Sequence, residues 1–244
     1  MDPDIRAKGP GKCSKCGMAL EPGIPTPVEY PVRVRAGKDW RFEVLHPKTR
    51  QRVRRFQVVH EKLFHLFVLS QDLEFFAHEH PKPAPDGTFR YRATLPKPGM
   101  YRLLCDFYPE GGTPQMVPLT LLTGAPGGTP QLAPDLTPKR ATNVEVELVT
   151  QPPQPLAGNK TLLFFRLQPG DGLEQYLGAW GHLLAASDDL VDAIHSHPAL
   201  ADGGPKLQFN VIFPREAMYR VWVQFQRQGK VNTAAFTVPV SRLK

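Results

Sequence analysis

Six of the eight histidines lie in two short windows, residues 65–81 and 182–198, and both windows space three of them as H-x12-H-x-H. The windows are 117 positions apart and share eight of seventeen residues, although they otherwise diverge. Imidazole nitrogens are good ligands for Zn(II) and Cu(II). The pattern therefore predicts a three-histidine metal site that is built twice, from His65, His78 and His80 and again from His182, His195 and His197.

The spacing also predicts how the imidazoles meet. His78 and His80 are two apart on an expected strand, so both project from the same face. A tight turn at 70–73 centres the hairpin so that His65 lies directly opposite His78, with Cβ atoms about 4.5–5.5 Å apart. The same arithmetic holds for the second window. The competing hypothesis is that a duplicated domain retained these histidines for packing alone.

Three further residues could supply ligands. His60 lies five residues before His65, and Leu177 holds the equivalent place in the second window, so His60 is a candidate extra ligand. Cys13-x-x-Cys16 offers two thiolates, which are soft ligands suited to Cu(I) or Zn(II). The same spacing occurs in redox pairs and disulfides. No βαβ pattern follows it, which disfavours a thioredoxin-like role.

The elements that must hold these side chains are strands. Residues 88–95 alternate between apolar and polar side chains, which indicates a half-buried strand, and Pro98-Gly99 marks a turn to the next one. Roughly seven such strands predict an immunoglobulin-like β-sandwich of about 100 residues. The pattern restarts after a stretch rich in Pro and Gly. We therefore expect an all-β chain with a CxxC segment at 1–24, sandwich repeats at 25–124 and 142–244, and a linker at 125–141.

Composition and motifs exclude several function classes. The net charge is +7, but the basic residues are mostly scattered, and the one cluster, at 48–55, is expected at a solvated hairpin tip. No nucleic-acid-binding motif accompanies it, so we expect no nucleic-acid partner. No window of eighteen apolar residues is present, so we expect no membrane span. No Ser/His/Asp set, phosphate loop or paired carboxylates stand in a recognisable context, and we expect no enzyme activity.

The N-terminal sequence M-D-P-D-I-R, followed by G-P-G-K-C-S-K-C-G-M-A-L-E-P, resembles the short heavy-metal-binding domain of copper-transporting ATPases and efflux membrane-fusion proteins. In that family the motif usually opens Cys-Pro-Met-(His/Asp)-Pro, and Met1-Asp2-Pro3 matches its last three positions. The resemblance implies that Cys13 and Cys16 bind metal, and that a further cysteine and an export signal precede Met1. We therefore expect a periplasmic or secreted protein.

A second resemblance covers Val58–Pro81 and Tyr176–Leu183, which read VVHEKLFHLFVLSQDLEFFAHEHP and YLGAWGHL. Both are similar to segments of bacterial extracytoplasmic domains that occur beside heavy-metal-binding domains and copper-resistance proteins. This resemblance implies that the three histidines of each window are metal ligands.

These features predict a protein that binds copper, as Cu(I) or Cu(II), with zinc as the alternative ion, because the Irving–Williams order favours copper where it is available. The ion is expected to be sequestered for resistance or passed to an efflux pump or membrane-fusion protein. Two alternatives stay open: a metal-free immunoglobulin-like interaction module, and a cupin-like metalloenzyme with histidine ligands. Cupins carry a Glu a few residues after H-x-H, and neither window does.

Overall fold

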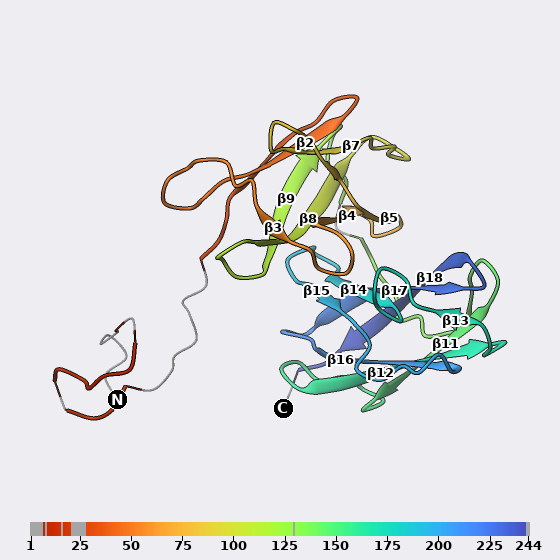
Figure 1. The fold of residues 1–244 in the computed structure, drawn as a ribbon. Coiled ribbons are helices and arrows are strands. Elements are labelled where there is room, and N and C mark those ends of the chain that lie inside the picture. The colour runs from red at the N-terminus through yellow and green to blue at the C-terminus, as the bar shows by residue number, and fades with distance from the viewer. Residues whose placement is uncertain (1–6, 8, 16, 21–27, 129, 243–244) are drawn as a thin grey trace.

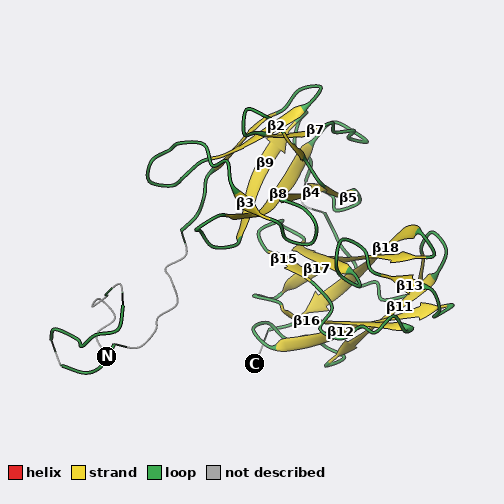
Figure 2. Ribbon diagram, viewed as in Figure 1, coloured by secondary structure: helices red, strands yellow, loops and turns green. Residues whose placement is uncertain are grey.

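The computed structural model describes residues 7, 9–15, 17–20, 28–128 and 130–242. Over these residues the regular elements are all β-strands, and they form two sandwiches that follow one another along the chain (Figure 2). Each sandwich pairs a four-stranded sheet with a five-stranded sheet. The prediction of an all-β chain with two immunoglobulin-like repeats is therefore confirmed. None of the described ranges holds a helix that is long and apolar enough to cross a membrane.

The first sandwich contains β1 to β9. Its four-stranded sheet has the order β1-β2-β7-β6, and its five-stranded sheet has the order β3-β8-β4-β5 with β9 beside β8. The strands are β1 (Val32–Arg35), β2 (Trp40–Val44), β3 (Phe56–Gln57), β4 (Phe64–Ser70), β5 (Phe76–Glu79), β6 (Lys82–Pro83), β7 (Phe89–Tyr91), β8 (Met100–Pro109) and β9 (Gln115–Leu122).

The second sandwich repeats this plan with β10 to β18. Its sheets have the orders β10-β11-β12-β16 and β13-β17-β14-β15, with β18 beside β17. The strands are β10 (Lys139–Arg140), β11 (Glu145–Gln151), β12 (Lys160–Gln168), β13 (Leu173–Glu174), β14 (His182–Ser187), β15 (Ala193–Ser196), β16 (Lys206–Ile212), β17 (Ala217–Arg227) and β18 (Lys230–Val240).

Alternation along the outer strands fills the core of each sandwich. In β2, Trp40, Phe42 and Val44 are buried while Arg41 is exposed, as expected where one face of a sheet packs and the other is solvated. The central strands β4 and β14 depart from this rule, because every residue in both is buried. A strand that is buried throughout is covered on both of its faces.

The second cover of β4 and β14 is the other sandwich. Figure 1 shows the sheet that contains β4, β5 and β8 beside the sheet that contains β14, β15 and β17. Leu66 and Val68 point into the first core, whereas Phe67 and Leu69 join an apolar cluster between the sandwiches. The buried members of this interface cluster are Phe67, Leu69, Leu73, Leu104, Leu184, Ala186, Leu190 and Trp222.

The β4–β5 hairpin has a register that is shifted by two residues along β4 from the predicted one. Phe67, not His65, lies opposite His78, so that part of the prediction is wrong. The turn is wider than expected because Leu73 adopts a left-handed conformation, with φ of 59°, and Leu190 does the same in the second hairpin, with φ of 58°. His65 and His78 still share a face, because residues directly opposite one another in a ladder point to the same side.

The stretch predicted as a linker contacts both sandwiches. The Gln71 side-chain amide donates to the Gly127 carbonyl oxygen (2.6 Å) and its oxygen accepts from the Gly127 amide (2.8 Å). Asp135 pairs with Thr237, and residues 139–140 form β10 at the edge of the second sandwich. The linker therefore ends as an edge strand of the second sandwich.

Trp222 is the largest side chain at the interface between the sandwiches, and its loss should destabilise the protein. It stacks on Phe76 with ring centroids 5.0 Å apart and planes 13° apart. Trp222→Ala should lower the free energy of unfolding by about 3–5 kcal/mol, as measured by urea unfolding. Ile212→Ala, at an outer-sheet position that is 57% exposed, is the control and should change it by less than about 0.5 kcal/mol. Equal effects of the two substitutions contradict this account of the interface.

Candidate metal centres

Each histidine window closes into a cluster of three imidazoles at the end of a hairpin. One nitrogen from each ring lies within 4.8 Å of the other two in both clusters. We refer to His65, His78 and His80 as the first triad, and to His182, His195 and His197 as the second triad. The structure therefore brings together all six of these histidines in the two predicted groups.

The two triads face one another across the interface between the sandwiches. The ring centroids of His78 and His182 are 5.3 Å apart, and those of His65 and His195 are 6.3 Å apart. His65 and His182 are both only 2% exposed. The clusters thus form one continuous patch of buried and half-buried imidazoles, with each repeat contributing half.

A two-residue turn fixes the first ring of the first triad. His60 and Glu61 both have positive φ, 47° and 65°, and Val59 and Lys62 exchange backbone hydrogen bonds across them. Positive φ at both central residues is the geometry of a tight hairpin turn. This turn presents the Val59 carbonyl oxygen to His65, and His65 Nε2 donates a hydrogen bond to that oxygen over 2.9 Å.

The second repeat builds the same support from different residues. Leu177 and Gly178 have φ of 53° and 68°, and the Tyr176 carbonyl oxygen accepts from His182 Nε2 over 2.9 Å. With Nε2 bonded to the turn, the Nδ1 atoms of His65 and His182 face the centres of their triads.

Hydrogen-bond partners determine which nitrogen of each ring carries the proton. His78 Nδ1 lies 3.0 Å from Gln224 Oε1, and the Gln224 amide nitrogen already donates to Thr233 Oγ1. We therefore assign the protons of His65 and His78 to Nε2 and Nδ1, respectively. The other two nitrogens, His65 Nδ1 and His78 Nε2, then carry no proton (we call such nitrogens bare), and they lie 3.1 Å apart.

Two bare nitrogens at this distance repel one another unless a cation lies between them. Nitrogens that bind one tetrahedral ion at about 2.0–2.1 Å are about 3.3 Å apart. In the second triad His182 Nδ1 and His197 Nε2 are also 3.1 Å apart. The closest pair of nitrogens in each triad therefore has a spacing that fits two ligands of a shared metal ion.

Each triad also contains a buried nitrogen with nothing to bond to. Within the described part of the chain, His80 Nε2 and His195 Nε2 have no hydrogen-bond partner. Leaving a buried polar atom unsatisfied costs about 1–3 kcal/mol. A metal ion at the centre of each triad would satisfy both atoms.

The middle histidine of each triad bonds to an acceptor from the other repeat. His78 Nδ1 donates to Gln224 Oε1 over 3.0 Å, and His195 Nδ1 donates to Asp106 Oδ2 over 2.6 Å. Asp106 in β8 and Gln224 in β17 are 118 positions apart, at equivalent places in the two repeats. Such acceptors orient a ligating imidazole and raise its basicity.

His60 lies against the second triad and not within the first. Its ring stacks on His197, with centroids 3.7 Å apart and planes 27° apart. A stacked ring presents its face to its neighbour, and His60 does not belong to either group of converging nitrogens. The structure thus does not place His60 in a ligand set.

Burial favours the neutral form of five triad imidazoles, which is the form that binds metal. Desolvation lowers the pKa of His80 to about 4, of His182 to about 3 and of His197 to about 2, and neighbouring imidazoles add to the effect. Desolvation likewise lowers the pKa of His65 and His78. Protons therefore compete weakly for these nitrogens at neutral pH.

The metal-free protein should lose stability as the pH falls from about 6.5 to about 4. In this window the unfolded chain protonates its histidines, whose ordinary pKa is 6.5, whereas the folded chain holds His80, His182 and His197 neutral. Each such histidine contributes up to about 1.4 kcal/mol per pH unit. Thermal unfolding in a chelator should show Tm falling steeply in this range. A Tm independent of pH contradicts the prediction, and a His80→Gln/His197→Gln variant should show a shallower slope.

The N-terminal thiol site is described only in part. Cys13 is 3% exposed in a short hairpin in which Lys12 bridges Ala19 and Gly17 has φ of 71°. Cys16 and the predicted motif residues 1–3 lie outside the described residues. Binding of metal by the pair of cysteines stays a prediction.

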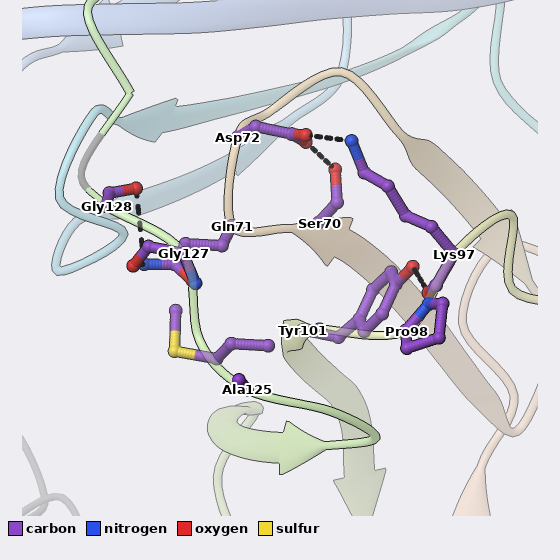
Figure 3. Close-up of a pocket in the computed structure, with 11 residues that line it drawn as sticks. Ser70, Gln71, Asp72, Lys97, Pro98, Tyr101, Ala125, Gly127 and Gly128 are labelled. Atoms are coloured by element: carbon purple, nitrogen blue, oxygen red, sulfur yellow. Dashed lines mark hydrogen bonds and ion pairs between the residues drawn. The ribbon is translucent and has the colours of Figure 1, made fainter.

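A surface pocket of about 210 Å³ lies in the first repeat, away from the triad residues (Figure 3). It surrounds the 70–73 turn, where the Lys97 ammonium pairs with Asp72 and the Tyr101 hydroxyl donates to the Lys97 carbonyl oxygen over 2.6 Å. Gly127 and Gly128 of the linker close one side. No histidine lines this pocket, so it does not coincide with either triad.

Sequence reasoning missed the groups that support the triads. Asp106 and Gln224 carried a signal, because both are polar residues at equivalent positions within mostly apolar strands. The Val59 and Tyr176 carbonyl groups carried none, since a backbone acceptor has no side-chain signature.

Comparison with known proteins bears on both parts of the chain. A family model described as a heavy metal binding domain matches residues 1–22, and this match and the two triads fit metal binding. No curated protein matches the chain. The crystal structure of chicken CNTN1 FN1-FN3 domains is similar with a TM-score of 0.23 and 10% identity, over 91% of this chain and 70% of that one, a level that carries no weight for the fold. A family model described as a domain of unknown function (DUF8832) matches residues 27–124 and 139–242, most of the chain, so the protein belongs to this family and contains its domain twice.

Proposed function

We propose that this protein is an extracytoplasmic copper-binding protein that holds one ion in each histidine triad. The observation that carries the proposal is the pair of bare nitrogens in the first triad, His65 Nδ1 and His78 Nε2, at 3.1 Å. Packing alone does not account for two lone pairs that are buried and aimed at one another. A cation between them removes the repulsion and also satisfies the unpartnered His80 Nε2.

The chemistry of the donors favours copper. Three neutral imidazoles suit Cu(II) and Zn(II), and a given site of this kind binds copper more tightly than zinc. The N-terminal thiolates of Cys13 and Cys16 suit Cu(I). Copper is therefore the proposed cargo, and zinc is the ion that the triads accept in its absence.

The proposed role is to sequester the ion or to pass it to an efflux pump or membrane-fusion protein, in the manner of copper-resistance proteins, in the periplasm or outside the cell. The match of residues 1–22 to a heavy metal binding domain supports this role, because it adds a second, softer site to a chain with two imidazole sites. We propose reversible binding without turnover.

Metal content of the purified chain tests the proposal. The Cys13→Ser/Cys16→Ser chain, which retains only the imidazole sites, should hold two copper ions after loading with Cu²⁺ and desalting. Electron paramagnetic resonance should show Cu(II) with nitrogen ligands, and a chelator should remove both ions without loss of the fold. If the Cys13→Ser/Cys16→Ser chain retains no copper, the metal-free interaction module becomes the better hypothesis.

A further inference from the structure

The two triads are supported reciprocally. The acceptor that holds His78 is Gln224 of the second repeat, and the acceptor that holds His195 is Asp106 of the first. Each acceptor also lies next to the first histidine of the triad in its own repeat. Asp106 is the cross-strand neighbour of His65, and Gln224 is the cross-strand neighbour of His182. Neither triad therefore has a complete set of supporting groups when its repeat stands alone.

The two acceptors are equivalent in position but differ in charge. Asp106 offers a carboxylate to His195 over 2.6 Å, whereas Gln224 offers a neutral amide oxygen to His78 over 3.0 Å. A hydrogen bond to a carboxylate is roughly twice as strong as one between neutral groups. It also moves electron density onto the ligating nitrogen, which strengthens the bond to a metal ion.

We propose that the second triad binds its metal ion more tightly than the first, and that the Asp106 carboxylate of the first repeat is the positioning residue responsible for this difference. Gln224 has the equivalent but weaker role for the first triad. This inference rests on the proposed function, since it ranks sites that must first bind an ion. It implies that copper fills the chain in order, second triad first. It also implies that separation of the sandwiches weakens both sites at once.

Two single-site proteins allow each affinity to be measured separately. In the Cys13→Ser/Cys16→Ser chain, His65→Ala leaves only the second triad and His182→Ala leaves only the first. Neither substituted histidine makes a hydrogen bond across the interface, because both donate to a carbonyl group of their own repeat. Competition for Cu²⁺ with a chelator then gives a dissociation constant for each triad, and circular dichroism checks the fold.

The second triad should bind Cu²⁺ more tightly than the first. Asp106→Asn, which keeps the shape of the acceptor and removes its charge, should weaken the second triad by about 10–100-fold. Gln224→Glu, equally conservative in shape, should tighten the first triad, a gain that loss of folding cannot imitate. Asp39→Asn removes a carboxylate that pairs with Arg92 away from both triads and should leave both affinities unchanged.

The possible failures are distinct. Equal affinities of the two triads, or an Asp106→Asn chain whose second triad binds as tightly as before, overturn this inference and leave the proposed function intact. Weaker copper binding by the first triad after Gln224→Glu also overturns it. Absence of copper from both single-site proteins overturns the proposed function itself.

Discussion

The double substitution His78→Ala/His195→Ala should reduce the copper retained by the Cys13→Ser/Cys16→Ser chain from two ions to none. Each substitution removes one of three ligand nitrogens and also the hydrogen bond that the ring makes to the other repeat. Loss of a supporting group alone costs about 10–100-fold in metal affinity, and loss of a ligand should cost more. Metal analysis after desalting, together with the loss of the Cu(II) resonance, measures the effect.

His46→Ala is the matched control for this experiment. His46 Nδ1 accepts hydrogen bonds from the Lys48 and Thr49 amides at a turn, and it belongs to neither triad. Its replacement should leave two copper ions bound. If the double variant and the control retain equal amounts of copper, the triads are not the binding sites.

The fold was predictable because the alternation of apolar and polar residues and the Pro and Gly turn signals agree along most of the chain. The alternation of residues 88–95 and the turn at Pro98-Gly99 indicated a β-sandwich, although the strand found there, β7, covers only Phe89–Tyr91. The restart of the pattern after the linker indicated the duplication of the sandwich. The repeated H-x12-H-x-H spacing grouped the six histidines in the two sets that the structure brings together. Spacing in a hairpin is local information, and local information is what a sequence pattern carries best.

The details that failed depend on conformation that the pattern does not specify. A four-residue turn at 70–73 placed His65 opposite His78, but the left-handed Leu73 widens the turn and shifts the pairing to Phe67. Leucine seldom adopts positive φ, so nothing in its identity signals this turn. The convergence of the histidines survived the error because a strand keeps residues 65 and 67 on one face.

The apposition of the two triads was beyond the reach of the sequence. It depends on contacts between residues from different repeats, such as Phe76 on Trp222 and Asp106 on His195. His60 shows the same limit, since proximity in sequence suggested the first triad and the structure stacks its ring on His197 of the second. The continuous burial of β4 and β14 results from this contact between the sandwiches. A buried strand does not by itself show which surface covers it.

Saturation with metal should raise the stability of the whole two-sandwich unit. An ion that binds only the folded chain adds about 4 kcal/mol per site at a thousand times its dissociation constant, and in a chain of this size each kcal/mol raises Tm by roughly 2–4 °C. Two filled triads should therefore raise Tm by well over about 10 °C. Zn²⁺ is the suitable probe for calorimetry because it has no redox chemistry.

The shape of the transition should also change, because the supporting bonds of each triad cross the interface. Without metal, the interface rests on its apolar cluster and a few polar contacts, so the sandwiches are free to unfold in separate steps. With both ions bound, unfolding of either repeat removes an acceptor from the other's site, and the two steps should merge into one. The His78→Ala/His195→Ala chain should show neither the rise in Tm nor the merging. A rise in Tm of the same size in that variant places the stabilising ion outside the triads.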